Sequence, residues 1–116
     1  MNKQIYDEVL KIEAEGLRDV ELLALVTDTS YEVIFYANHN GKVCQSNNLA
    51  ESGVLSLDFV EKIYSDIADK IRADEKFDPA KMNIIKASGE NITVEYDEKN
   101  CRVYGLKKEW KNSIGL

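Results

Sequence analysis

Two stretches of the chain repeat apolar residues at the spacing of an amphipathic helix. In residues 2–15, Ile5, Val9 and Ile12 recur every three or four positions. In residues 57–73 a longer apolar stripe has the same period and a charged opposite side. The stripe consists of Leu57, Val60, Ile63, Tyr64, Ile67, Ala68 and Ile71. The pattern therefore predicts two long helices, each with one apolar face.

Between these helices, runs of β-branched and aromatic residues predict strands. Residues 17–26 are apolar on both faces, which is typical of a strand in the middle of a sheet. Residues 31–37 and 42–45 flank an Asn-Gly pair that suits the tight turn of a β-hairpin. Residues 46–53 are small and polar, and we expect a loop there that could include a short strand.

The last third of the chain predicts a second hairpin and a terminal helix. In residues 82–96 two β-rich runs are joined by Ser-Gly, and Ile92 and Val94 alternate with polar residues. A short helical segment then carries Trp110, the only tryptophan. We expect Trp110 to be at least half buried and to hold the tail, because a large side chain can bury much area at one point.

The order of these elements predicts an α+β fold. We expect a single antiparallel sheet of about 4–6 strands, packed by two helices at about residues 2–15 and 57–73, and a short C-terminal helix. The 116 residues suffice for one domain, residues 1–116. Most aromatic side chains are expected in the core. Seven residues are expected in the core by name: Ile5, Val9, Phe35, Ile63, Ile67, Ile92 and Val94.

The net charge of the chain is −6, from 15 Lys and Arg against 21 Asp and Glu. An acidic domain repels phosphate backbones and attracts basic surfaces, so no nucleic-acid partner is expected. Lys107, Lys108 and Lys111 form the only basic cluster, which is too small to reverse this balance.

Neither a membrane segment nor a signal peptide is visible in the sequence. The longest apolar run, residues 22–26, is far too short to span a bilayer, and the N-terminus has no apolar core. Cys44 and Cys101 are expected to be reduced thiols, because nothing suggests export. We therefore expect a cytoplasmic protein with no membrane partner.

The residues that catalysis would need are scarce. His39, the only histidine, lies in the predicted hairpin turn, where it would have to reach Cys44 or a serine to act as a base. One His and two Cys do not make a zinc site, and no Gly-rich phosphate loop is present. The sequence therefore predicts a protein that is not an enzyme, with no catalytic residue, cofactor, metal or small-molecule substrate.

The densest acidic surface lies on the second long helix and the loop before it. Its residues are Glu51, Asp58, Glu61, Asp66 and Asp69. Helical spacing places Asp58, Glu61 and Asp69 along one side. We interpret this surface as the candidate interface for a basic partner, and an ordinary solvated helix face is the alternative. Two smaller acidic surfaces are also candidates. They are Asp7, Glu8 and Glu15 on the first helix, and residues 95–98.

Three features of this layout point to a known family. They are a helix (residues 5–12) that leads towards a Phe35-Tyr36 strand, a long helix (57–71) followed by Phe77-Asp78, and a hairpin (84–96) followed by Trp110 and a Gly115-Leu116 ending. In these features the chain resembles the YezG-like immunity proteins, small bacterial antitoxins that neutralise toxins used in competition between cells. That family typically carries a further Trp at the start of the last hairpin, where this chain has Met82 and Asn83.

The resemblance implies an immunity protein that neutralises a cognate toxin by forming a stoichiometric complex. Toxins of this kind are often nucleases with basic substrate grooves, which fits a net acidic partner. A scaffold or subunit-assembly module without a toxin partner is the alternative function. A small-ligand binder is a third hypothesis, for which the sequence shows no specific set of polar residues.

Overall fold

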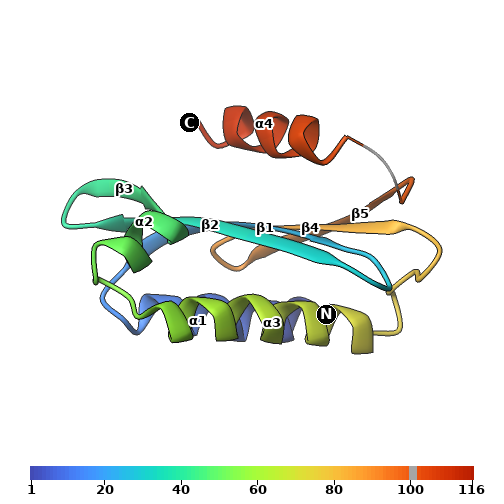
Figure 1. The fold of residues 1–116 in the computed structure, drawn as a ribbon, viewed down its shortest axis with the longest axis horizontal. Helices are drawn as coiled ribbons and strands as arrows, with labels where there is room; N and C mark the ends of the chain where they lie inside the picture. Colours follow the sequence, from blue (N-terminus) through green and yellow to red (C-terminus); the bar gives the residue numbers. More distant parts are fainter. Residues whose placement is uncertain (100–101) are drawn as a thin grey trace.

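The computed structural model describes residues 1–99 and 102–116, and its helices and strands form a mixed α+β fold (Figure 1). In chain order the elements are α1 (Asn2–Glu13), β1 (Arg18–Val26), β2 (Tyr31–His39), β3 (Lys42–Gln45), α2 (Ser46–Glu51), α3 (Leu57–Ala73), β4 (Met82–Ser88), β5 (Asn91–Asp97) and α4 (Val103–Ser113). The strands make one antiparallel five-stranded sheet in the order β3-β2-β1-β4-β5. The predicted fold class is confirmed.

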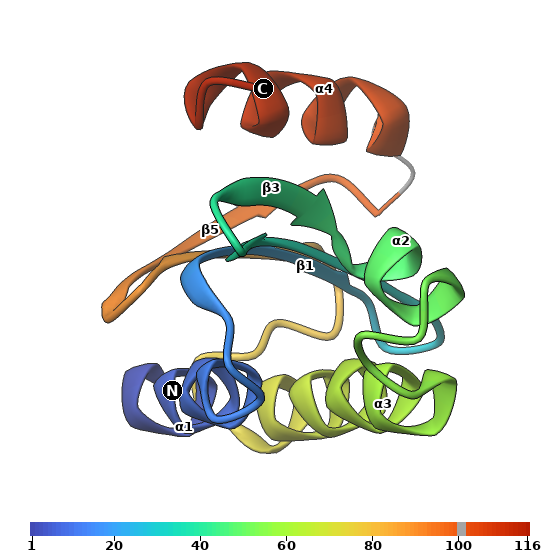
Figure 2. The same ribbon diagram turned by 90° about the vertical axis from the view of Figure 1, so that its left-hand side faces the viewer.

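The fold has three layers. Helices α1 and α3 lie side by side against one face of the sheet, and α4 lies against the other (Figures 1 and 2). Strand β1 pairs with β2 on one side and β4 on the other, so it is central, as its two apolar faces predict. Leu22 and Ala24 pack towards α1 and α3, whereas Leu23 and Leu25 pack towards α4.

The larger core fills the space between the sheet and the two long helices. Five of the seven expected core residues are buried there: Ile5, Val9, Phe35, Ile63 and Ile67. The prediction overestimated the burial of the other two, Ile92 and Val94, which are only partly buried. They lie on β5, an edge strand of the sheet, where burial is less complete than at the centre.

The smaller core lies between the sheet and α4. Trp110 is 2% exposed, which confirms the prediction that it is at least half buried. It packs with Leu23, Leu25, Ile34, Met82 and Ile84, and its ring centroid lies 5.8 Å from that of Tyr36. Val103, Leu106 and Ile114 pack on this core only partly buried, so Trp110 is the one fully buried side chain among the described residues of α4.

Local signals in the sequence explain where several elements turn or begin. Asn40 and Gly41 have positive φ angles of 53° and 84°, the backbone of a tight type I′ hairpin turn. The hydroxyl of Ser56 accepts a hydrogen bond from the backbone N–H of Phe59 at 3.0 Å and caps the start of α3. Helix α3 then ends at Ala73.

Residues 46–51, expected to lie in a loop, form the short helix α2 instead. Leu49 is buried against the larger core, and the Ser46 hydroxyl, also buried, accepts a hydrogen bond from the Phe35 N–H. Such a short helix shows almost no apolar period, so its packing on β2 and α3 decides its conformation. None of the described helices is long and apolar enough to cross a bilayer.

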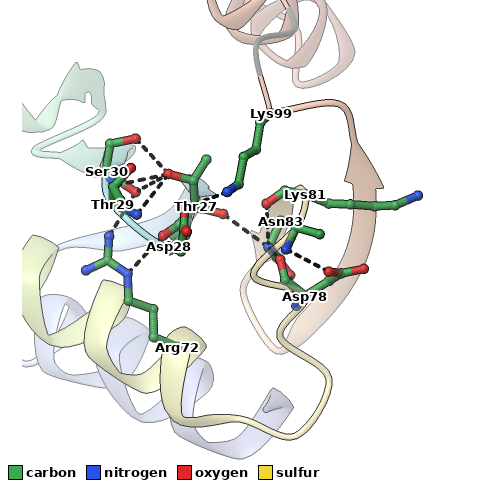
Figure 3. A network of polar contacts seen from close by, with 11 residues as sticks. Thr27, Asp28, Thr29, Ser30, Arg72, Asp78, Lys81, Asn83 and Lys99 are labelled. Carbon is green, nitrogen blue, oxygen red and sulfur yellow. Dashed lines mark hydrogen bonds and ion pairs between the residues drawn. The ribbon is translucent and has the colours of Figure 1, made fainter.

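The segment between α3 and β4 is held by Asn83, which is completely buried (Figure 3). Its side-chain oxygen accepts a hydrogen bond from the Asp78 N–H at 2.9 Å. Its Nδ2 group donates to the carbonyl oxygens of Val26 at 3.2 Å, Asp78 at 2.8 Å and Lys81 at 3.1 Å. Because these backbone groups are satisfied by one side chain, the segment can pack tightly without regular secondary structure.

The opposite end of the same network fixes α3 to the turn between β1 and β2. Arg72 donates from Nε to the carbonyl of Thr27 at 3.0 Å, and from Nη2 to the carbonyl of Ser30 at 2.9 Å (Figure 3). Its guanidinium also lies 5.7 Å from the centre of the Tyr31 ring. Arg72 therefore has a structural role, because these contacts join α3 to the turn between β1 and β2.

Candidate functional site

The five predicted toxin-binding residues, which we name the acidic face, come from α2 and α3. Glu51 ends α2, and Asp58, Glu61, Asp66 and Asp69 belong to α3. Four of them are exposed, whereas the Asp66 side chain is 26% exposed and pairs with Lys62 at 3.1 Å. The structure therefore separates Asp66, whose charge has a partner, from the other four.

The basic residues of α3 are all engaged. Lys62 pairs with Asp66, and Lys70 reaches across to Glu8 on α1 at 3.0 Å. Arg72 binds backbone carbonyls in the network described above. Among the described residues, no ion pair is formed by the four exposed carboxylates. They are Glu51, Asp58, Glu61 and Asp69. The helix thus presents an excess of negative charge to solvent.

An apolar side chain lies beside these carboxylates. Leu57, the first residue of the predicted apolar stripe, is 59% exposed because it begins α3, beyond the part of the stripe that the sheet covers. It lines a hollow of about 210 Å³ with Asn47, Ala50 and Glu51. The position of Leu57 directly after the N-cap is the only sequence signal for this exposure. An apolar group within a polar rim is the usual anatomy of a protein interface.

The alternative acidic surfaces are weakened by internal pairing. Glu8 is completely buried and pairs with Lys70 at 3.0 Å and with Lys11 at 3.2 Å, so it links α1 to α3 instead of facing a partner. On β5, Glu95 pairs with Lys86 at 3.5 Å. The interpretation of Glu8 as an interface residue is therefore wrong, because its place on the inner side of α1 was not visible from the sequence.

His39 and Cys44 lie on the same face of the β2–β3 hairpin. The register pairs His39 with Lys42 and Ala37 with Cys44, so the two side chains are diagonal neighbours. Each contacts the hairpin itself: the His39 ring contacts the Asn40 amide, and the Cys44 thiol donates to the Lys42 carbonyl at 3.7 Å. No His39–Cys44 hydrogen bond is present in the part of the chain that the structure describes. Cys101 lies outside the described residues.

Among the described residues, three groups have displaced pKa values, and none of them is one of the five carboxylates of the acidic face. The ion pair with Lys99 lowers the pKa of Asp28, and the ammonium group of Met1, at 2.8 Å, lowers the pKa of Asp74. Burial raises the pKa of Tyr64, against the effect of its hydrogen bond with Ser46. Each of these groups joins separate elements, which is a structural role.

Residues 1–99 and 102–116 contain no group of three or more His, Cys, Asp or Glu side chains that could hold a metal ion. Comparison of the chain with protein-family models and with curated protein sequences finds no match. Function must therefore be inferred from the arrangement of the residues.

Proposed function

We propose that this protein is an immunity protein that neutralises a toxin domain, of nuclease type, by forming a stoichiometric complex in the cytoplasm. The observation that carries the proposal is the acidic face, where four exposed carboxylates have no ion-pair partner among the described residues. Several carboxylates on one surface match the basic groove of a nuclease, which has to bind a phosphate backbone.

The electrostatic arrangement suits fast association. Charges at the rim of an interface mainly raise the association rate, whereas a central apolar contact slows dissociation. Glu61 and Asp69 would raise the association rate. Leu57 would slow dissociation, since the exposed Leu57 side chain lies beside Glu51 in the α2–α3 hollow. The interface would thus be centred on the start of α3.

The direct test is co-expression with the adjacent open reading frame, scored by growth rescue from the toxin that the proposal expects it to encode. We expect rescue by the unaltered protein and a 1:1 complex with the purified toxin domain. The association rate should fall with rising salt, because the attraction is screened. Normal growth arrest together with the absence of a complex would exclude this function.

A charge-reversal pair locates the interface. Glu61→Lys with Asp69→Lys should leave the fold intact, because both residues are exposed and unpaired among the described residues. It should slow association by about tenfold or more and weaken rescue. Glu75→Lys with Glu90→Lys makes the same change in charge at exposed positions outside the acidic face. Equal effects of the two pairs would show that only net charge matters.

The assembly-module alternative is supported by one feature of the sheet. The edge strand β3 is only four residues long, and its Val43 side chain is 50% exposed. Such an edge can pair with another strand. Sedimentation of the purified chain over a range of concentrations tests this function, because self-association that Val43→Lys abolishes would favour assembly over toxin binding.

A further inference from the structure

A second surface, on the opposite side of the sheet, has its own binding geometry. A groove of about 440 Å³ runs between α4 and β2. Its lining residues from the sheet are Ile34, Tyr36 and Gln45, and those from the α4 segment are Tyr104, Lys107, Lys108, Lys111, Asn112 and Leu116. Figure 2 shows α4 lying over this face of the sheet. The groove is therefore bounded by a helix on one side and floored by a strand.

The helix contributes positive charge to this groove in an otherwise acidic protein. Lys107 pairs with Glu32 of β2 at 2.6 Å, so these two charges offset each other. Lys111 lies 5.8 Å from the centre of the Tyr36 ring, and in the described residues neither Lys108 nor Lys111 has a carboxylate partner. Two ammonium groups are thus available to an anionic ligand above a partly apolar floor.

The strand contributes an edge that is not paired with another described strand. Strand β3 pairs with β2 only from Tyr36 to His39, and no described strand pairs with residues 31–35 on the side away from β1. The N–H of Phe35 points to that side, because it donates to Ser46. Since strand backbone groups alternate in direction, the N–H and carbonyl of Val33 point the same way.

An exposed aromatic residue completes the groove. Most aromatic residues were expected in the core, but the Tyr104 side chain is 80% exposed. It lies on the groove side of α4, one helical turn before Lys107 and Lys108. An exposed tyrosine at this position can pack on an apolar side chain of a ligand.

We propose that this groove binds an extended acidic segment of a partner protein. The backbone of the segment would pair with the free edge of β2 at Val33, its carboxylates would contact Lys108 and Lys111, and its apolar side chains would pack on Tyr104. Strand addition to a sheet edge supplies affinity through the backbone, and the alternate side chains supply selectivity. This inference does not depend on toxin binding by the acidic face, which lies across the sheet (Figure 1).

The test uses a fluorescent eight-residue peptide of alternating Glu and Val, with blocked ends, and the unaltered full chain. Anisotropy should show saturable binding that weakens with salt, and a Lys-Val peptide should bind at least about tenfold more weakly. Methylation of alternate backbone nitrogens in the Glu-Val peptide should abolish binding, because it removes the donors that pair with β2. Equal affinity for the acidic and basic peptides, or no binding of either, would overturn the proposal.

Two sets of variants assign the site. Lys108→Gln with Lys111→Gln should raise the Kd about tenfold, whereas Lys76→Gln with Lys81→Gln, the same charge change at exposed positions outside the groove, should not. Tyr104→Ser should also weaken binding at an unchanged Tm, since the side chain is exposed. Unchanged affinity in the Lys108 and Lys111 variant would refute the site.

A nucleic-acid ligand is the competing occupant, because lysines beside tyrosines also suit a single strand. We expect unlabelled Glu-Val peptide to displace the probe at lower concentration than an eight-nucleotide oligothymidylate does. The reverse order would reject the acidic segment in favour of a nucleic acid.

Discussion

The two faces of the sheet are covered in different ways. Against one face, α1 and α3 present continuous apolar stripes and bury a broad core that includes Phe35. Against the other, α4 depends on Trp110 and a few neighbours, and a groove of about 440 Å³ remains at its side. Helices with a continuous apolar stripe can cover a face of the sheet completely. A helix held mainly by one side chain leaves a groove beside it that a ligand can occupy.

The largest effect is expected in the broad core. Phe35→Ala should lower the free energy of unfolding by about 3–5 kcal/mol, because Phe35 is completely buried between the sheet and the helices. Urea denaturation measures this change, and amide exchange should rise in all elements together. A loss no larger than that of Trp110→Ala would mean that the two faces are equally tolerant.

On the other face, Trp110→Ala should cost about 3 kcal/mol, since Trp110 is 2% exposed. The loss should be local, because few other side chains hold α4. Hydrogen exchange should therefore show that α4 loses protection while β1 keeps it. Simultaneous loss of protection in α4 and β1 would contradict the independence of the two faces.

The segment that joins the faces depends on Asn83. Asn83→Ala should cost about 2 kcal/mol, because it leaves the Asp78 N–H and the Val26 carbonyl without their partner. Asn112→Ala is the control, since Asn112 is exposed and should change stability by no more than about 0.5 kcal/mol. Thermal unfolding of both variants makes the comparison, and similar Tm values would contradict it.

The start of α3 should be more sensitive than its outer surface. Ser56→Ala removes the hydroxyl that accepts the Phe59 N–H and should cost about 1 kcal/mol. Ser65→Ala is a matched change on the same helix, where the hydroxyl only donates to the Lys62 carbonyl. Urea unfolding should rank Ser56→Ala as the more damaging variant, and the opposite order would argue against the cap.

The smallest effect is expected for Asp28, an exposed residue that pairs with Lys99 at 2.9 Å. The hydrogen bond from Lys99 lowers the pKa of Asp28 below its ordinary value of 3.8, so the folded state favours the ionised form. The pair therefore adds stability above that value, and the contribution disappears as the pH falls through the lowered pKa. Asp28→Asn should slightly reduce the Tm at about pH 7 but not at about pH 2. A difference that persists in acid would contradict this origin.

The sequence predicted most of the fold because its signals are local or periodic. The helix stripes, the Asn-Gly turn and the two-sided apolar run of β1 each reflect the neighbours that a residue meets in regular structure. The short helix α2 was missed because six residues carry too little periodicity, and Ile92 was placed too deep because edge position depends on strand order.

Local sequence patterns predicted only part of the candidate site. Helical spacing placed Asp58, Glu61 and Asp69 on one side, and composition showed that the chain is acidic. Spacing could not show that Asp66 is paired, that Leu57 is exposed or that the cations of α3 are engaged, because those facts depend on partners elsewhere in the fold.

By itself, the sequence determined the fold class, the central position of β1, the burial of Trp110 and the acidic balance of the surface. Each follows from side-chain chemistry and short-range geometry. Only the tertiary structure showed that Glu8 is buried and that the Asn83 side chain forms hydrogen bonds with backbone groups of the segment between α3 and β4. It also showed that a groove lined by lysines lies beside α4, next to an unpaired part of the β2 edge. These features bring together residues far apart in the chain, and their distances are set by packing, which no local pattern encodes.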